Sequence, residues 1–129
     1  MQIKFIFPVW VFYVNKIGKN DYVHAVSYGF WITILKKYKD DKGLFAHEMV
    51  HIKQFWTRGF LIHKYLYHFW KYYRFKCELD AYVKQWKINK GDEKLKKNYV
   101  IRIQKGYGLN YSEEYILKNL TKKFTKFLL

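Results

Sequence analysis

The sequence predicts an α+β fold in which a short N-terminal sheet, antiparallel or mixed, packs on a bundle of helices. β-Branched and aromatic residues are concentrated before residue 36, whereas apolar residues recur at helical spacing from residue 44 onward. Half of the 129 residues are hydrophobic, which supplies enough apolar surface for a core. No linker-like segment divides the chain, so we expect one domain over residues 1–129.

Three segments near the N-terminus are expected to supply the sheet. Phe5 to Val14 is an unbroken apolar run, typical of a buried strand or a packed N-terminal segment. The run has about half the length of a membrane-spanning helix, and no small-residue cleavage site follows it, so we expect neither an anchor nor a signal peptide. Asp21 to Ser27 and Gly29 to Leu35, both rich in β-branched and aromatic residues, are the other predicted strands.

The first helix is predicted from its cap and from the spacing of its apolar residues. Asp40 and Asp41 offer N-caps for a helix that begins near Gly43 or Leu44. Its apolar positions recur at helical spacing: Leu44, Phe45, Met49, Ile52, Phe55 and Trp56. The helix is expected to end at about Thr57, ahead of a glycine.

Three or four further helices are expected. Phe60 to Ile88 contains no proline or glycine and predicts one or two long helices, broken near Tyr72. A helix over Glu93 to Lys105 follows, and Ser112 caps a last helix whose first turn carries two glutamates. The apolar stripe of that last helix is expected to dock on the core: Ile116, Leu120, Phe124 and Phe127.

The strong positive charge is a weak guide to partners. Lysine and arginine together number 25 against 10 acidic residues, a net charge of +15. Only Arg58, Arg74 and Arg102 are arginines, whereas recognition of phosphates and bases favours arginine, so the lysine excess indicates compositional bias and gives nucleic-acid binding little support. The single cysteine, Cys77, excludes an internal disulfide, and we expect a cytoplasmic protein without a transmembrane segment.

The chemistry of the chain is concentrated in a His-Glu-x-x-His motif inside the first predicted helix. His47 and His51 are four residues apart, so their imidazoles project from one helix face, close enough to share one metal ion. Glu48 is then placed to reach a water molecule at the metal and to accept its proton. This arrangement is typical of hydrolytic zinc sites, and it predicts one zinc ion (Zn2+) per chain.

A catalytic zinc site needs a third protein ligand. The extended pattern HExxHxxGxxH is excluded, because Gln54 and Thr57 stand where it requires glycine and histidine. Two other residues are candidates. Glu78 lies 27 residues past His51 on a separate predicted helix, and His63 lies in the connecting segment.

The motif and its surroundings resemble the gluzincin metallopeptidases. The resemblance rests on the run from Gly43 to His51, continued by Gln54 and by Glu78 to Ala81. The sequence is similar in particular to small single-domain zincins that have an HExxHxxQ helix and a downstream ExxA motif. The resemblance covers the segment from Gly29 to Gln85 and implies a minimal zincin-like fold.

For the site, this resemblance implies that the two motif histidines and Glu78 are zinc ligands and that Glu48 is the catalytic base. It also implies that Gly29 to Leu35 is the edge strand on which a substrate peptide pairs. The sequence departs from the pattern at Tyr82, because many gluzincins carry there an aspartate that supports a ligand histidine. Asp80, which lies on a different helix face from Glu78, is therefore an alternative ligand.

A group that stabilises negative charge on the substrate oxygen usually lies near the metal. The candidates are four residues that precede Glu78 in the chain: His68, Tyr72, Tyr73 and Arg74. Each of them also fits a packing or surface role, and Arg74 is spaced to pair with Glu78 instead.

Together these features predict a zinc-dependent peptidase, an endopeptidase in preference, that acts on a peptide or protein. One alternative is a DNA-associated metalloprotease that resembles the SprT-like proteins, with His63 as a ligand. Another is a zincin-fold module without turnover in a larger assembly, such as a virus particle or a toxin system, in a phage or bacterial setting. Aromatic residues make up 22% of the chain, more than a small core can bury, so we also expect a docking or self-association surface.

Overall fold

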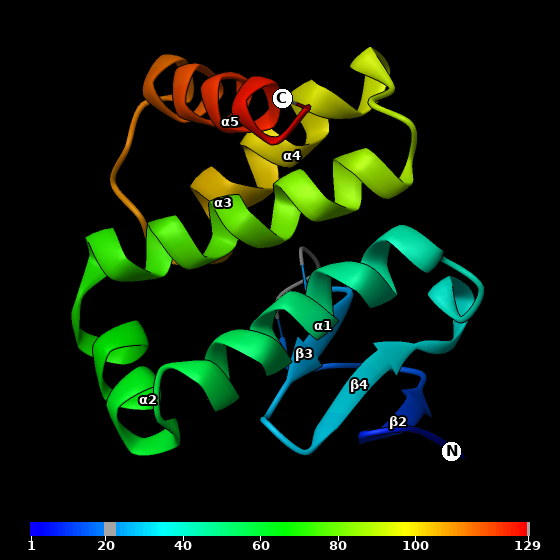
Figure 1. The fold of residues 1–129 in the computed structure, drawn as a ribbon. Helices are drawn as coiled ribbons and strands as arrows, with labels where there is room; N and C mark the ends of the chain where they lie inside the picture. The colour runs from blue at the N-terminus through cyan, green and yellow to red at the C-terminus, as the bar shows by residue number, and fades with distance from the viewer. Residues whose placement is uncertain (20–22, 129) are drawn as a thin grey trace.

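The computed structural model describes residues 1–19 and 23–128, the last two without their side chains. It confirms the α+β class: a four-stranded mixed sheet is followed by five α-helices along these residues (Figure 1). The strands are β1 (Gln2–Ile6), β2 (Val9–Val14), β3 (Ala25–Ser27) and β4 (Trp31–Leu35). A short 3-10 helix, η1 (Lys36–Tyr38), leads to α1 (Lys42–Thr57), α2 (Phe60–Phe69), α3 (Lys71–Ile88), α4 (Glu93–Gly106) and α5 (Glu113–Leu128).

The strands form one sheet in the order β1-β2-β4-β3. β1 and β2 make an antiparallel hairpin, β2 lies parallel to β4, and β3 pairs antiparallel with β4. The apolar run from Phe5 to Val14, expected to be one segment, is instead split between two strands. Pro8 has no N–H to donate to a sheet ladder, so it stands in the turn between them. Of the predicted strand Asp21 to Ser27, residues 21 and 22 lie outside the described residues, and Ala25–Ser27 forms β3.

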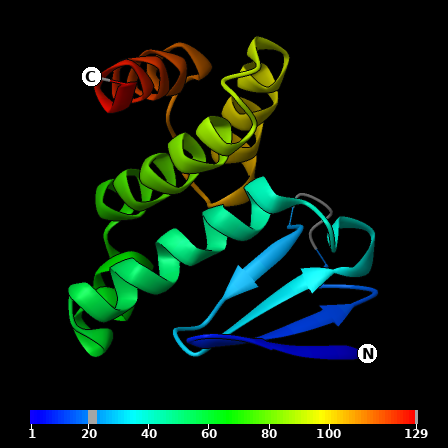
Figure 2. The same cartoon turned by 45° about the vertical axis from the view of Figure 1, so that its right-hand side comes forward.

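The sheet has one covered and one open face. Side chains alternate along β2 and β4, and those directed toward α1 form a first core with Leu44 and Ile52 of that helix. The strand residues in this core are Val9, Val11, Tyr13, Ile32 and Ile34. The other face carries exposed apolar side chains, among them Phe5, Trp10 and Trp31. Figure 2 shows α1 crossing the covered face, with α3, α4 and α5 beyond it.

A second core lies between α3, α4 and α5. It is formed by Phe75, Leu79, Tyr82, Val83, Trp86, Tyr99, Val100, Ile103, Leu109, Ile116 and Leu120. Ser112 precedes α5 as predicted, and its hydroxyl accepts a 3.2 Å hydrogen bond from the N–H of Tyr115. The predicted stripe of α5 docks on this core, since Ile116 and Leu120 are buried and the ring of Phe124 lies 4.0 Å from that of Trp86. The side chain of Phe127 lies outside the described residues.

Helices α1 and α3 lie side by side between the two cores and run in opposite directions (Figure 1). Asp41 begins α1, because its carboxylate accepts a 2.9 Å hydrogen bond from the N–H of Leu44. The predicted segment Phe60 to Ile88 divides at Trp70, where the backbone is extended, and this break allows α3 to return along α1. Among the described residues, none of the helices has both the length and the hydrophobicity that crossing a membrane requires.

Candidate metal centre

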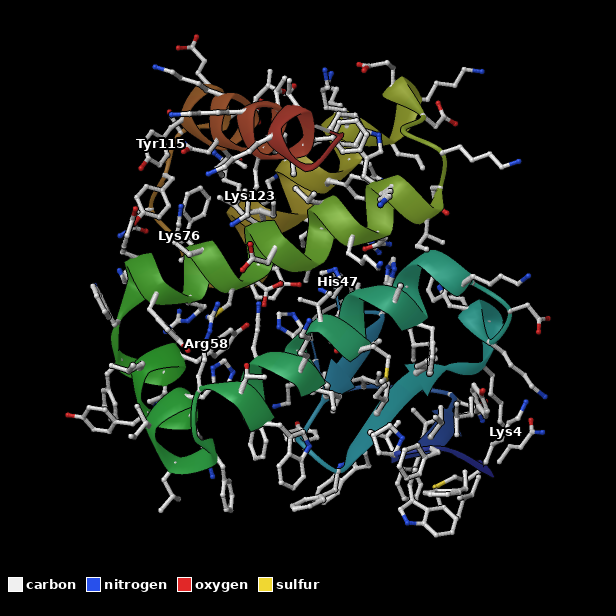
Figure 3. All side chains as sticks on the ribbon, viewed as in Figure 1. Lys4, His47, Arg58, Lys76, Tyr115 and Lys123 are labelled. Carbon is white, nitrogen blue, oxygen red and sulfur yellow. The ribbon has the colours of Figure 1, made fainter. Side chains whose placement is uncertain are left out.

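Helices α1 and α3 bring His47, His51 and Glu78 together. The two histidines project from one face of α1, one turn apart, and Glu78 faces them from α3. Their Nε2 atoms are 3.2 Å apart. The Glu78 atom Oε2 lies 3.4 Å from His47 Nε2, and Oε1 lies 3.2 Å from His51 Nε2. Figure 3 places His47 in the space between the two helices.

The three side chains are close enough together to bind one metal ion. Zinc binds imidazole nitrogen and carboxylate oxygen at about 2.0–2.1 Å, so two ligand atoms at the tetrahedral angle are about 3.3–3.4 Å apart. The two imidazole nitrogens are 3.2 Å apart, and each of them lies within 3.4 Å of one of the two Glu78 oxygens. One ligand atom from each of the three residues lies within 4.8 Å of the other two. Two nitrogens and one carboxylate oxygen are also a common donor set for catalytic zinc. The residues therefore fit a zinc ion held by the three side chains.

Gln54 fixes the tautomer of His51. Its Nε2 donates a 3.1 Å hydrogen bond to the backbone carbonyl of Cys77, so its Oε1 is the atom that faces His51 Nδ1, at 3.0 Å. An amide oxygen only accepts, so His51 carries a proton on Nδ1, and Nε2 is the ring nitrogen that is left for a metal ion once its own proton has gone. The sequence reasoning gave Gln54 no role, although its position one turn after His51 is the signal that could have suggested this one.

Tyr67 of α2 provides a further contact that the sequence reasoning missed. Its hydroxyl donates a hydrogen bond to Glu78 Oε1. Burial and the nearby Glu78 carboxylate raise the pKa of Tyr67 well above its usual value, so the phenol keeps its proton and remains a donor. One tyrosine among the aromatic residues of α2 carries no sequence signal for this contact, because the contact depends on how α2 is oriented against α3.

The second histidine of the motif has a different surrounding. His47 Nδ1 is buried and has no hydrogen-bond partner among the described residues. The ring of Tyr82 lies edge-on to that of His47, with 4.3 Å between the centroids. Tyr82 stands where the resemblance led us to expect a supporting aspartate, and it contributes a ring contact in place of a carboxylate. Its hydroxyl is directed to that of Tyr107, 3.2 Å away.

The electrostatics of the cluster favour an ionised Glu78. Burial alone would raise the pKa of this carboxyl, but His51 and His47 outweigh burial and hold it well below its usual range. Burial likewise opposes a charge on His51, yet the Glu78 carboxylate raises the pKa of His51 to about 9. In the metal-free protein these shifts favour a buried ion pair between His51 and Glu78.

Glu48 follows His47 in the chain, and among the described residues its carboxylate has no hydrogen bond and no ion pair. Its side chain is 4% exposed and lines the same cavity as the three ligands. The carboxylate is therefore available to a water molecule or substrate in the cavity, as a general base requires.

The two alternative ligands have partners elsewhere. His63 is buried in α2, and its Nδ1 forms a 2.7 Å hydrogen bond with the hydroxyl of Tyr73. Asp80 forms ion pairs with Arg58, at 3.6 Å, and with Lys123. Within the described residues, neither is part of the group whose ligand atoms lie within 4.8 Å of one another. The arrangement with a third histidine is thus not the one that the structure assembles.

The four candidates for stabilising a substrate oxygen are also dispersed. Tyr73 contacts His63, and Tyr72 is exposed on the outside of α3. Arg74 does not pair with Glu78, since it donates to the backbone carbonyls of Tyr67, His68 and Tyr107. His68 is exposed and lines the cavity, so it is the member of this group that lies on the same open space as the ligands.

A cavity of about 750 Å³ opens over the three ligands. Its walls come from β3 and the turn after it, from α1, α2 and α3, and from the end of α4. The strand beside it corrects one expectation, because β4 is paired on both sides, by β2 and β3, and is therefore not an edge. The edge strand next to the cavity is β3, which precedes β4 in the chain and pairs with it in the antiparallel direction.

Comparison with known proteins adds no relative: no protein-family model matches the chain, and neither does a curated protein or a solved structure.

Proposed function

We propose that this protein is a zinc-dependent peptidase. The observation that carries the proposal is the close grouping of His47, His51 and Glu78, with the Glu48 carboxylate, which has no hydrogen-bond or ion-pair partner among the described residues, lining the same cavity. Two histidines, a carboxylate and a neighbouring glutamate supply the ligands and the base that hydrolysis by activated water needs.

Each residue has a defined part in this mechanism. A zinc ion held by His47, His51 and Glu78 would supply Lewis acidity, which would lower the pKa of a water molecule and polarise a carbonyl oxygen. Glu48 accepts the proton of the attacking water and passes it to the leaving nitrogen. Gln54 and Tyr67 hold His51 and Glu78 in the orientation that binding requires.

The cavity supports an extended peptide as the substrate. β3 lies at the edge of the sheet and leaves one row of backbone groups without a strand partner among the described residues. An extended segment can pair with such an edge by main-chain hydrogen bonds. Because β3 has three residues, we expect the pairing to involve a few residues on each side of the scissile bond.

The test combines zinc content with hydrolysis of an unfolded protein such as reduced casein. Wild type is expected to bind one zinc ion per chain and to cleave casein, whereas Glu48→Gln is expected to keep the zinc and to lose cleavage by at least ~100-fold. Glu114→Gln is the matched control, because Glu114 is exposed on α5, far along the chain from the motif. Equal cleavage by wild type and Glu48→Gln would refute the assigned base.

A structural role for zinc is the second candidate, and one observation favours it. His47 and His51 belong to the helix that covers the sheet, whereas Glu78 belongs to the helix of the second core. An ion between them would join the two cores in a protein that performs no turnover. One zinc per chain, together with no cleavage of casein by wild type, would favour this binding module over the peptidase.

A further inference from the structure

The three arginines of the chain differ in what they contact. Arg58 pairs with Asp80 and donates to Cys77 Sγ, and Arg74 donates to three backbone carbonyls. Within the part of the chain that the structure describes, Arg102 pairs with no carboxylate and donates to no backbone carbonyl. Among the described residues its guanidinium has one hydrogen-bond acceptor, His24 Nε2 at 2.7 Å, and no ion pair with a carboxylate.

Arg102 lies in the cavity that contains the metal ligands. It projects from α4, is partly buried, and lines the cavity together with His47, His51 and Glu78. A guanidinium has five N–H donors, so most of its hydrogen-bonding capacity is left for a ligand. A charged group that is partly desolvated without a counter-charge is unfavourable unless a ligand supplies one.

His24 holds Arg102 in this position. Arginine only donates hydrogen bonds, so His24 Nε2 accepts, and the imidazole is neutral when the contact is made. The ring of His24 is itself fixed, because it stacks on Tyr38 with 4.2 Å between the centroids. The guanidinium is therefore oriented by a packed ring, and not by a flexible surface contact.

The charges of the cavity select the sign of the ligand. The only acidic residues among its described lining are Glu48 and Glu78, and both belong to the metal centre. Arg102 and Lys64 are the cationic side chains of the same lining. A divalent metal ion offsets the two carboxylates, which leaves two positive charges facing the cavity.

We propose that Arg102 is a specificity residue that binds a carboxylate group of the substrate. The proposal rests on the peptidase function and defines its substrate class as peptides with a carboxylate near the scissile bond. Guanidinium and carboxylate match in a planar pair of hydrogen bonds, which is stronger and more selective than a contact with an amide. The carboxylate comes either from the C-terminus of the peptide or from an acidic side chain.

Binding of three fluorescein-labelled peptides to the Glu48→Gln protein tests this site without turnover. The first is a hexapeptide of alanine and leucine with a free C-terminus, the second is its C-terminal amide, and the third is the amide with one leucine replaced by glutamate. We expect the first or the third to bind ~10-fold or more tightly than the second, and the stronger of the two identifies the source of the carboxylate.

The variants assign the effect to the guanidinium. Arg102→Gln in this background is expected to bind all three peptides equally, and Arg102→Lys to retain part of the preference while conserving charge and packing. Lys105→Gln is the matched control, since Lys105 is exposed on the same helix and does not line the cavity. Zinc content and circular dichroism verify that each variant is folded.

The outcomes separate this proposal from the proposed function. Equal binding of the three peptides before Arg102 is changed, or a preference that survives in Arg102→Gln, overturns the carboxylate site even if casein is cleaved. A preference that Arg102→Gln abolishes supports the site. If wild type then fails to cleave the preferred peptide, the peptidase function is refuted and the carboxylate site remains.

Discussion

Replacing Gln54 by leucine is expected to weaken zinc binding without removing a ligand. The side chain is 5% exposed and joins His51 Nδ1, at 3.0 Å, to the carbonyl of Cys77, at 3.1 Å. Without the amide oxygen, His51 is free to place its proton on Nε2, the atom that must bind the metal. Loss of such a supporting contact typically lowers metal affinity by ~10–100-fold, which corresponds to about 1.4–2.7 kcal/mol at 25 °C.

The matched control for this change is Gln85→Leu. Gln85 is also a buried glutamine, 3% exposed, but it lies on α3 two turns after Glu78 and does not contact the ligands. Both substitutions remove a buried amide, so their shared effect on folding can be subtracted. The assay is competition for zinc with a chromophoric chelator, accompanied by thermal unfolding of the metal-free proteins. If Gln54→Leu binds zinc within about threefold of Gln85→Leu, the tautomer argument is refuted.

Three further predictions address the ligand set, its protonation and the core. Glu78→Gln is expected to reduce zinc from one ion per chain to a small fraction, whereas Asp80→Asn retains it; elemental analysis decides, and equal zinc in both variants would contradict the assignment. Glu78 raises the pKa of His51 in the metal-free protein to about 9, above the unfolded value, so the stabilisation that the His51 proton gives is complete below about pH 6.5 and is lost as the pH rises through about 9. Zinc must displace that proton, so its affinity should rise about tenfold per pH unit between pH 7 and 8, with one proton released per ion; calorimetry in buffers of different ionisation enthalpy measures this, and no release at pH 7 would contradict it. Leu79→Ala in the second core is expected to cost ~2–5 kcal/mol in urea unfolding, against about 0.5 kcal/mol or less for Leu117→Ala, whose side chain is 40% exposed; similar costs would show that the second core is packed differently.

The features that the sequence predicted well are local in the chain. Asp41 and Ser112 begin helices close to the expected positions, because capping depends on residues within one turn. The stripe that contains Ile116 and Leu120 is buried, because period and polarity together define one helix face. The HExxH spacing places two imidazoles on one face of α1 for the same reason.

The features that it did not predict depend on pairing between distant segments. The parallel contact of β2 with β4, which moves β4 to the interior of the sheet, joins strands that are separated by a further strand in the sequence. The hydrogen bond from Tyr67 to Glu78 depends on the angle between α2 and α3. Hydrophobic periodicity defines the face of each element but contains no information about its neighbours. The third ligand therefore stayed open among Glu78, His63 and Asp80 until the helices were placed.

The position of the three ligands on two different cores has a consequence for the lifetime of the chain in a cell. Neither the sheet with α1 nor the bundle of α3, α4 and α5 contains all three candidate ligands, so the proposed zinc ion would bind only the assembled molecule. A ligand present at 100 times its dissociation constant stabilises the folded state by about 2.7 kcal/mol. Chains that lack the ion would then open more often between α1 and α3 and be exposed to degradation. Zinc supply would thereby set the abundance of the protein in addition to its activity, and pulse-chase measurements at low and high zinc would record it.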